Sequence, residues 1–104
     1  MSLCLDPAQR AALDALAPGE CLRIDVADGD SLVAVHAGGA VQVYRNRCPH
    51  RGTELDWIPG AFLSPDRRHL QCATHAALFD PHTGRCVSGP CAGERLERVF
   101  VPPA

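Results

Sequence analysis

The sequence predicts one small all-β domain with a single short helix near its N-terminus. The chain has 104 residues, which is the size of one domain. Its nine glycines and nine prolines exceed the average share and indicate many turns and loops. Several segments also alternate between apolar and polar residues, as strands with one buried face do. These three observations favour an antiparallel β-structure over a helical one.

The helix is expected close to the N-terminus. Asp6 is a good helix cap, Pro7 suits the first helical position, and strong helix formers follow as far as Leu16. Pro18 and Gly19 then form a stop signal. We therefore expect a helix that begins at Pro7 and ends before Pro18.

Three strands are expected next, in segments 20–27, 31–37 and 41–44. The first two segments are rich in β-forming residues and partly alternate, and the third alternates cleanly. Asp28-Gly29-Asp30 is typical of a hairpin turn, and Gly38-Gly39 leads into the third strand. We expect these strands to form an antiparallel meander.

Short strands are expected in the second half of the chain as well. Residues 69–71 lead into Cys72, and residues 77–79 lead out of the loop that follows it. Segment 54–62 carries enough apolar side chains to support that region. Residues 95–101 alternate sufficiently to form a closing strand that returns to the first sheet.

Two short Cys/His pairs are the strongest chemical signal in the sequence. Cys48 and His50 form a C-x-H pair, Cys72 and His75 form a C-x-x-H pair, and residues 51–71 separate the two. Two thiolates and two imidazoles make a four-ligand metal set that suits either zinc or an iron-sulfur centre. Because the two side chains of each pair leave one loop, they can bind two neighbouring irons. We expect both loops to lie at the ends of hairpins.

The segments around these pairs resemble the Rieske iron-sulfur domain. The resemblance is carried by C-P-H-R-G at 48–52, C-A-T-H at 72–75, Leu78-Phe79-Asp80 and Thr83-Gly84-Arg85. It implies one [2Fe-2S] cluster per chain, in which two histidines replace two cysteines on one iron. By this resemblance, Cys48 and Cys72 bind the first iron, and His50 and His75 bind the second.

The resemblance also implies a fold. It indicates a Rieske-like antiparallel β-sandwich, with residues 1–104 as a single domain and a cluster-binding subdomain at about residues 46–91. A Gly-Pro loop covers the cluster in that family, and Gly89-Pro90 occupy the corresponding place here.

The residues beside the ligands indicate a centre of the ferredoxin or oxygenase type. High-potential respiratory relatives join the two ligand loops by a disulfide, at places where this chain has Thr53 and Thr74. Those relatives also donate hydrogen bonds to sulfur from a Ser and a Tyr. Ala77 and Phe79 replace them here, and neither side chain can donate. We therefore expect a potential toward the lower end of the Rieske range of about −150 to +300 mV. Ala76 stands where a glycine commonly follows the second histidine.

The predicted function is electron transfer rather than catalysis. Two neutral imidazoles leave the oxidised cluster without net charge, which makes it a ready acceptor of one electron. The sequence shows no nucleophile–base pair and no mononuclear iron motif. We expect a ferredoxin that accepts an electron from a reductase and passes it to an oxygenase or another redox partner.

Charge and hydropathy narrow the range of partners. The formal net charge of −2 provides no basic field for nucleic acid or an anionic membrane. No run approaches the roughly 20 apolar residues that span a bilayer, and the first ten residues lack the features of a signal peptide. We therefore expect a cytoplasmic monomer with no nucleic-acid partner and no membrane partner.

Three other interpretations remain open from the sequence. The Cys/His pairs could bind zinc in a binding module. The chain could also be the small Rieske subunit of a larger oxidoreductase, similar to the small subunit of assimilatory nitrite reductase. Finally, Cys86 and Cys91 could form a redox dithiol or disulfide, although we expect them to be buried or half-buried thiols.

The remaining conspicuous residues are expected to have structural roles. Cys4 and Cys21 are predicted to be packing residues or exposed thiols, and Trp57 a core residue. Three histidines without a partner at metal spacing are predicted at the surface or in turns: His36, His69 and His82. Four acidic residues are predicted to be solvated or to form a docking rim: Glu54, Asp56, Asp66 and Asp80.

Overall fold

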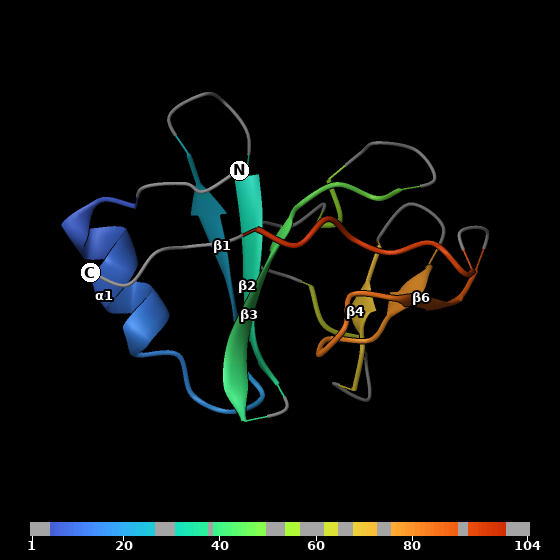
Figure 1. Ribbon diagram of the computed structural model, residues 1–104, viewed down its shortest axis with the longest axis horizontal. Helices are drawn as coiled ribbons and strands as arrows, with labels where there is room; N and C mark the ends of the chain where they lie inside the picture. The colour runs from blue at the N-terminus through green and yellow to red at the C-terminus, as the bar shows by residue number, and fades with distance from the viewer. Residues whose placement is uncertain are drawn as a thin grey trace.

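A computed structural model contains two three-stranded antiparallel sheets and one short helix (Figure 1). The predicted fold class, mostly β with one N-terminal helix, is confirmed. The structure describes residues 5–26, 31–37, 39–49, 54–56, 62–64, 68–72, 76–89 and 92–99.

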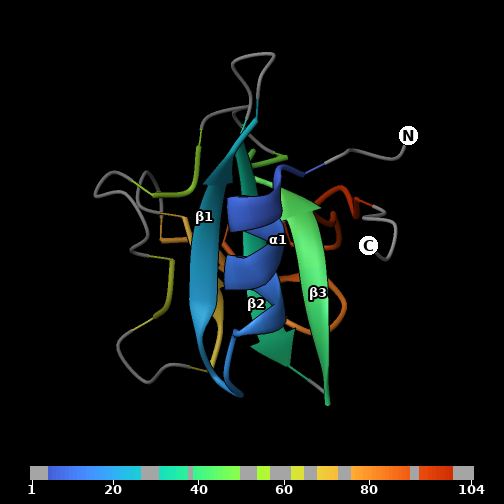
Figure 2. The same ribbon diagram turned by 90° about the vertical axis from the view of Figure 1, so that its left-hand side faces the viewer.

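The helix α1 (Pro7–Asp14) begins where the sequence predicts. Asp6 caps it by accepting a hydrogen bond from the backbone N–H of Gln9 at 2.8 Å, and the Gln9 side chain accepts in return from the Asp6 N–H. This reciprocal pair is a capping box, which satisfies two backbone donors that a helix end otherwise leaves unpaired. The helix ends with Ala15 as its C-cap, earlier than the run of helix formers suggests. Figure 2 shows α1 lying across one face of the larger sheet.

The larger sheet, called the base sheet below, is the predicted meander of β1 (Cys21–Asp25), β2 (Ser31–Ala37) and β3 (Ala40–Arg45). Its register pairs Leu22 with Ala34 and Ala34 with Val43. The first strand is shorter than segment 20–27: it begins at Cys21 and ends at Asp25.

The two faces of the base sheet are both covered, so its central strand alternates between two cores. Leu32 and Ala34 point to the side of α1, where they pack in a cluster with Leu13. Val33 and Val35 point to the opposite side, into the larger buried cluster. A strand buried on both faces is apolar at consecutive positions, which explains the run Leu-Val-Ala-Val.

The second sheet, called the small sheet, consists of β4 (Leu70–Gln71), β5 (Leu78–Phe79) and β6 (Cys86–Ser88). Leu63 adds an isolated bridge to Leu70, which brings segment 62–64 alongside β4. The pairing of β5 with β6 is irregular, with a register shift between Leu78 and Phe79. These very short strands depend on their surroundings more than on their own pairing.

The last described segment links the two sheets. Arg95 forms a bridge to Arg85 at the start of β6, and Arg98 forms a bridge to Tyr44 in β3. Backbone hydrogen bonds from Arg45 N–H to Glu97 and from Val99 N–H to Val43 support the second contact. The predicted return of segment 95–101 to the base sheet is confirmed over its described residues, although it forms isolated bridges rather than a continuous strand.

In the described part of the chain, no helix combines the length and hydropathy needed to span a bilayer.

Candidate metal centre

The first half-motif begins directly after the base sheet. Cys48 lies three residues beyond the end of β3, and its side chain is buried, with 3% exposed. Residues 54–56, the next part of the chain that the structure describes, are not in a strand. Residues 50–53 and 57–61 lie outside the described residues, so the hairpin expected at this loop stays a prediction.

The second half-motif does hang from a hairpin, as predicted. Cys72 follows β4 and is 1% exposed. Its backbone N–H donates to the carbonyl of Ala77 at 2.9 Å, so the loop between them closes onto the pairing of β4 with β5.

The two cysteines belong to one buried cluster, and neither forms a disulfide. A pair of buried thiols surrounded by apolar side chains fits a soft metal centre shielded from water. His50 and His75 lie outside the described residues. Among the residues that are described, no three Cys, His, Asp or Glu side chains converge as a metal site. The four-residue ligand set of Cys48, His50, Cys72 and His75 therefore stays a prediction.

The backbone next to the second half-motif has two unusual positions. Ala76, the residue after His75, has φ of 54° and is the only non-glycine residue with positive φ in the described segments. Gly89 has φ of 107°, and a Cβ there would lie 2.9 Å from the Cα of Ala77. Gly89 thus packs against the end of the Cys72 loop, in keeping with the covering role predicted for Gly89-Pro90. Pro90 itself is outside the described residues.

Near the two cysteines, Ala77 and Phe79 occupy the two positions from which high-potential relatives donate hydrogen bonds to sulfur. Ala77 and Phe79 are both buried in the cluster that contains Cys48 and Cys72. Neither side chain can donate, so sulfur atoms there would receive no hydrogen bond from either of them. Thr53 and Thr74 lie outside the described residues.

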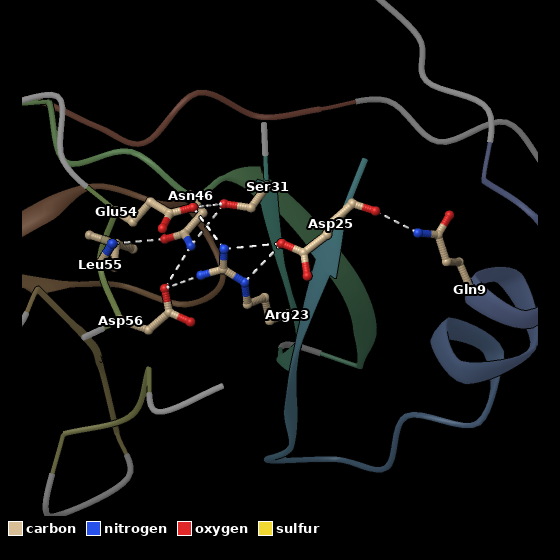
Figure 3. Close-up of polar contacts among 8 residues, drawn as sticks. All are labelled: Gln9, Arg23, Asp25, Ser31, Asn46, Glu54, Leu55 and Asp56. Carbon is tan, nitrogen blue, oxygen red and sulfur yellow. Dashed lines mark hydrogen bonds and ion pairs between the residues drawn. The ribbon is translucent and has the colours of Figure 1, made fainter. Parts of the chain in front are cut away.

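One acidic residue predicted to be solvated is in fact buried. The Asp56 side chain is 0% exposed, and its Oδ1 accepts hydrogen bonds from Arg23 at 2.9 Å and from Asn46 at 2.8 Å (Figure 3). Glu54 remains half-exposed and also binds Arg23. Burial lowers the pKa of Arg23, but its hydrogen bonds to Asp25, Glu54 and Asp56 outweigh that effect and leave the pKa raised. Asp80 accepts from two backbone N–H groups of its turn, and Asp66 is outside the described residues.

A second contact missed by sequence reasoning joins the two sheets. The buried hydroxyl of Tyr44 donates to the carbonyl of Pro81 at 3.0 Å, and Arg98 lies over the Tyr44 ring at 5.7 Å from its centroid. Gly84 makes room for this ring, because a Cβ there would approach it to 2.7 Å. Burial raises the pKa of Tyr44, with Arg98 acting in the opposite direction.

The other residues given structural roles have mixed outcomes. Cys21 is half-buried and packs against the larger cluster, and Cys86 is buried with its thiol donating to the Ser88 carbonyl at 3.4 Å. His82 lies exposed in a turn, as predicted, whereas His36 is half-buried in β2. His69 is half-buried in a bend, which is compatible with the predicted surface or turn position, although its Nδ1 is buried and has no hydrogen-bond partner within the described segments. Three further residues are outside the described part of the chain: Cys4, Trp57 and Cys91.

Comparison with known families decides the identity of this arrangement. The profile described as "Rieske [2Fe-2S] domain" matches residues 8–102, which is nearly the whole chain. The chain belongs to the Rieske [2Fe-2S] domain family. No protein with a curated function matches the sequence.

Solved structures place this Rieske chain beside small ferredoxins. The ferredoxin of carbazole 1,9a-dioxygenase from Nocardioides aromaticivorans IC177 is 30% identical, with a TM-score of 0.58 over 83% of this chain and 78% of that one. The Sphingomonas yanoikuyae B1 ferredoxin is 22% identical, with a TM-score of 0.64 over 88% and 84%. A chain in the complex of reduced oxygenase and oxidised ferredoxin of carbazole 1,9a-dioxygenase is 21% identical, with a TM-score of 0.62 over 83% and 74%.

Two predictions are confirmed by these relationships. The cofactor of the Rieske family is a [2Fe-2S] cluster, as the Cys/His pairs indicate. Rieske ferredoxins are electron carriers rather than catalysts, and this chain is a homologue of them.

Proposed function

We propose that the protein carries single electrons on one [2Fe-2S] cluster bound by Cys48, His50, Cys72 and His75. The observation that supports this ligand set is the burial of both cysteines in one apolar cluster. When bound, the cluster supplies reversible one-electron chemistry. The buried Cys48 and Cys72 would bind one iron, and His50 and His75 would bind the other.

The surroundings of the cysteines favour a potential toward the lower end of the Rieske range. Burial excludes water, and Ala77 and Phe79 donate no hydrogen bonds. Fewer hydrogen bonds to sulfur leave the reduced state less stabilised, which lowers the potential. Such a carrier suits transfer from a reductase to an oxygenase.

The partner we propose is an oxygenase, with a reductase as the electron donor. The 30%-identical relative is the ferredoxin of a dioxygenase, and a second structural neighbour is in a complex of oxygenase and ferredoxin. Redox encounters use interfaces below about 1,200 Å² in total, so a patch around His50 and His75 would suffice. We further propose that the protein is cytoplasmic and acts as a monomer.

The ligand set is tested by metal analysis with spectroscopy of anaerobically purified protein. We expect two irons and two acid-labile sulfides per chain, and an EPR signal only after reduction. One zinc with no sulfide would overturn the proposal in favour of a zinc module. Cys48→Ser and Cys72→Ser should each abolish the iron signal, whereas Cys21→Ser should retain it.

A further inference from the structure

The loop that carries Cys48 is closed at its base by one buried side chain. Asn46 lies two residues before Cys48 and is 1% exposed. Its Oδ1 accepts from the Leu55 N–H at 2.8 Å, and its Nδ2 donates to Asp56 at 2.8 Å. One amide therefore joins the residues just before the loop to the residues just after it (Figure 3).

The same amide fixes the loop to the base sheet. Nδ2 of Asn46 also donates to the Ser31 hydroxyl at 3.2 Å, and its backbone N–H donates to the Ser31 carbonyl at 2.9 Å. Ser31 begins β2, the central strand, which is buried on both faces. The side chain thus uses three of the four hydrogen bonds that an amide can make. A rigid strand supports the loop through it.

Arg23 compensates the buried carboxylate that completes this arrangement. Asp56 is fully buried, and a buried charge is tolerated only when it is paired and hydrogen-bonded. Arg23 reaches across from β1 and binds both Asp56 and Glu54 at 2.9 Å. Glu54 in turn accepts a short hydrogen bond from the Ser31 hydroxyl. Both ends of the loop are therefore held by residues from β1 and β2.

The contacts that join Asn46, Ser31, Arg23 and Asp56, called the clamp below, also reach the buried cysteines through Leu55. Leu55, whose N–H binds Asn46, is fully buried in the same cluster as Cys48 and Cys72. Displacing Leu55 would disturb the apolar wall shared by both thiols. Groups that support metal ligands in this way affect metal affinity and electronic properties without touching the metal.

We propose that Asn46 is a positioning residue for the iron-sulfur cluster, which holds the Cys48 loop closed through Leu55 and Asp56. This proposal rests on the ligand set given above. Asn46 does not bind the cluster. It keeps the first half-motif in one geometry, so that the cluster is released slowly and its reduced state has a single electronic environment.

The test compares cluster release and EPR spectra of full-length holoproteins. Asn46→Ala removes three side-chain hydrogen bonds and should release iron to a ferrous chelator at least tenfold faster, the factor that one buried hydrogen bond of about 1.4 kcal/mol produces. Its reduced EPR signal should broaden, because the loop samples several geometries. Gln42→Ala removes an amide from β3 that makes no described hydrogen bond, and it should match the wild type.

An exchange of donor and acceptor tests whether Asn46 acts through Asp56. Asn46→Asp keeps the acceptor for Leu55 but faces Asp56 with a second carboxylate, so release should be at least as fast as in Asn46→Ala. The double variant Asn46→Asp/Asp56→Asn has the wild-type net charge and reverses the hydrogen bond. It should recover part of the retention, because the pair at positions 46 and 56 is restored while the carboxylate that binds Arg23 is lost. If it releases iron no more slowly than Asn46→Asp, the proposed contact is wrong.

The proposal would be overturned if Asn46→Ala lowered the unfolding midpoint equally in apoprotein and holoprotein while iron release and the EPR signal stayed unchanged. Asn46 would then stabilise the fold without positioning the iron-sulfur cluster. If Asn46→Ala does not fold, Ser31→Ala removes the hydroxyl that accepts from Asn46 and donates to Glu54. It should accelerate release about twofold, and no acceleration would count against the proposal. Wild-type iron and sulfide counts separate these results from a failure of the ligand set itself.

Discussion

The base sheet and the small sheet of this Rieske chain are stabilised in different ways. The base sheet has strands of five to seven residues in unbroken register and a helix packed on one face. The small sheet has strands of two or three residues and an irregular register. It holds its shape through particular contacts, such as Gly89 against Ala77 and Tyr44 against Gly84. Regular pairing maintains the first region, and contacts of single residues maintain the second.

The largest expected effect separates the two regions by removing the cofactor. Cys72→Ser should abolish iron binding, because a serine hydroxyl is a poor replacement for a thiolate ligand. Since metal binding contributes folding energy where the ligands lie, backbone amides of residues 70–88 should lose protection from hydrogen exchange. Residues 21–45 should stay protected. Exchange mass spectrometry measures both, with Cys21→Ser as the control, and equal loss in both regions would contradict this comparison.

A large steric effect is expected at the glycine that packs against the Cys72 loop. Gly89→Ala places a Cβ 2.9 Å from the Cα of Ala77, a backbone atom that cannot rotate away. Overpacking and positive-φ strain together should destabilise the holoprotein by about 3 kcal/mol. Gly93→Ala is the matched control, since its φ is 94° and nothing lies within 4 Å of the new Cβ.

The control should cost only about 1 kcal/mol, the strain of the positive φ alone. Denaturant titration of both variants measures the difference. Similar losses for the two alanines would show that the contact between Gly89 and Ala77 is not close in solution.

The joint between the sheets should be sensitive to alkaline pH. Burial raises the pKa of Tyr44 above the ordinary value of about 10. The fold therefore favours the neutral phenol, so this contribution to stability is complete below about pH 10 and is lost as the pH rises further. Unfolding free energies measured from pH 8 to pH 11.5 should fall more steeply for the wild type than for Tyr44→Phe. The variant itself should start about 1 kcal/mol lower, because it loses the hydrogen bond to Pro81. Parallel curves would show that the pKa of Tyr44 is the same in the folded and unfolded states.

The sequence predicts the helix and the base sheet well because their signals are local. Asp6 and Pro7 mark the helix start, and alternation marks the strands. The spacing of the Cys/His pairs is an equally local signal, but the ligand set that it indicates stays a prediction. The clamp around Asn46 is not predictable in this way. Arg23 and Asp56 are 33 residues apart in sequence, and no local pattern indicates that they meet.

The same limit applies to the joint between the sheets. In the sequence, Tyr44 looks like an ordinary strand residue and Gly84 like an ordinary turn residue. Only the tertiary structure shows that the Tyr44 ring occupies the space that a Cβ at position 84 would need. A buried carboxylate such as Asp56 is equally ambiguous, because its sequence neighbours do not reveal the guanidinium that neutralises it.

A smaller effect is expected on the reduction potential. Phe79→Tyr adds a hydroxyl within the buried cluster that contains Cys72. If that hydroxyl donates to sulfur, it stabilises the reduced state, and every 1.4 kcal/mol raises a one-electron potential by about 59 mV. We expect a rise of several tens of millivolts in a redox titration followed by EPR. Phe62→Tyr adds a hydroxyl to another buried ring of the same hydrophobic cluster and should leave the reduction potential unchanged. A Phe79→Tyr potential equal to that of the wild type would mean that the hydroxyl does not reach sulfur.

The smallest expected effect is a gain of stability at Ala76. Its φ of 54° places an alanine in the left-handed region, which costs about 1–2 kcal/mol for a residue with a Cβ. Glycine avoids that strain but loses about 0.5–1 kcal/mol more backbone entropy on folding. Ala76→Gly should therefore stabilise the protein by about 0.5–1 kcal/mol.

The neighbouring change Ala77→Gly should have the opposite sign, because Ala77 has no positive φ and its methyl group is buried. Denaturant midpoints of the two holoproteins give the comparison, and a loss of stability in Ala76→Gly would mean that the loop after His75 does not hold this conformation. A gain confined to Ala76 would show that the strain lies next to the Cys72 half-motif, since the regular strands of the base sheet contain no such position.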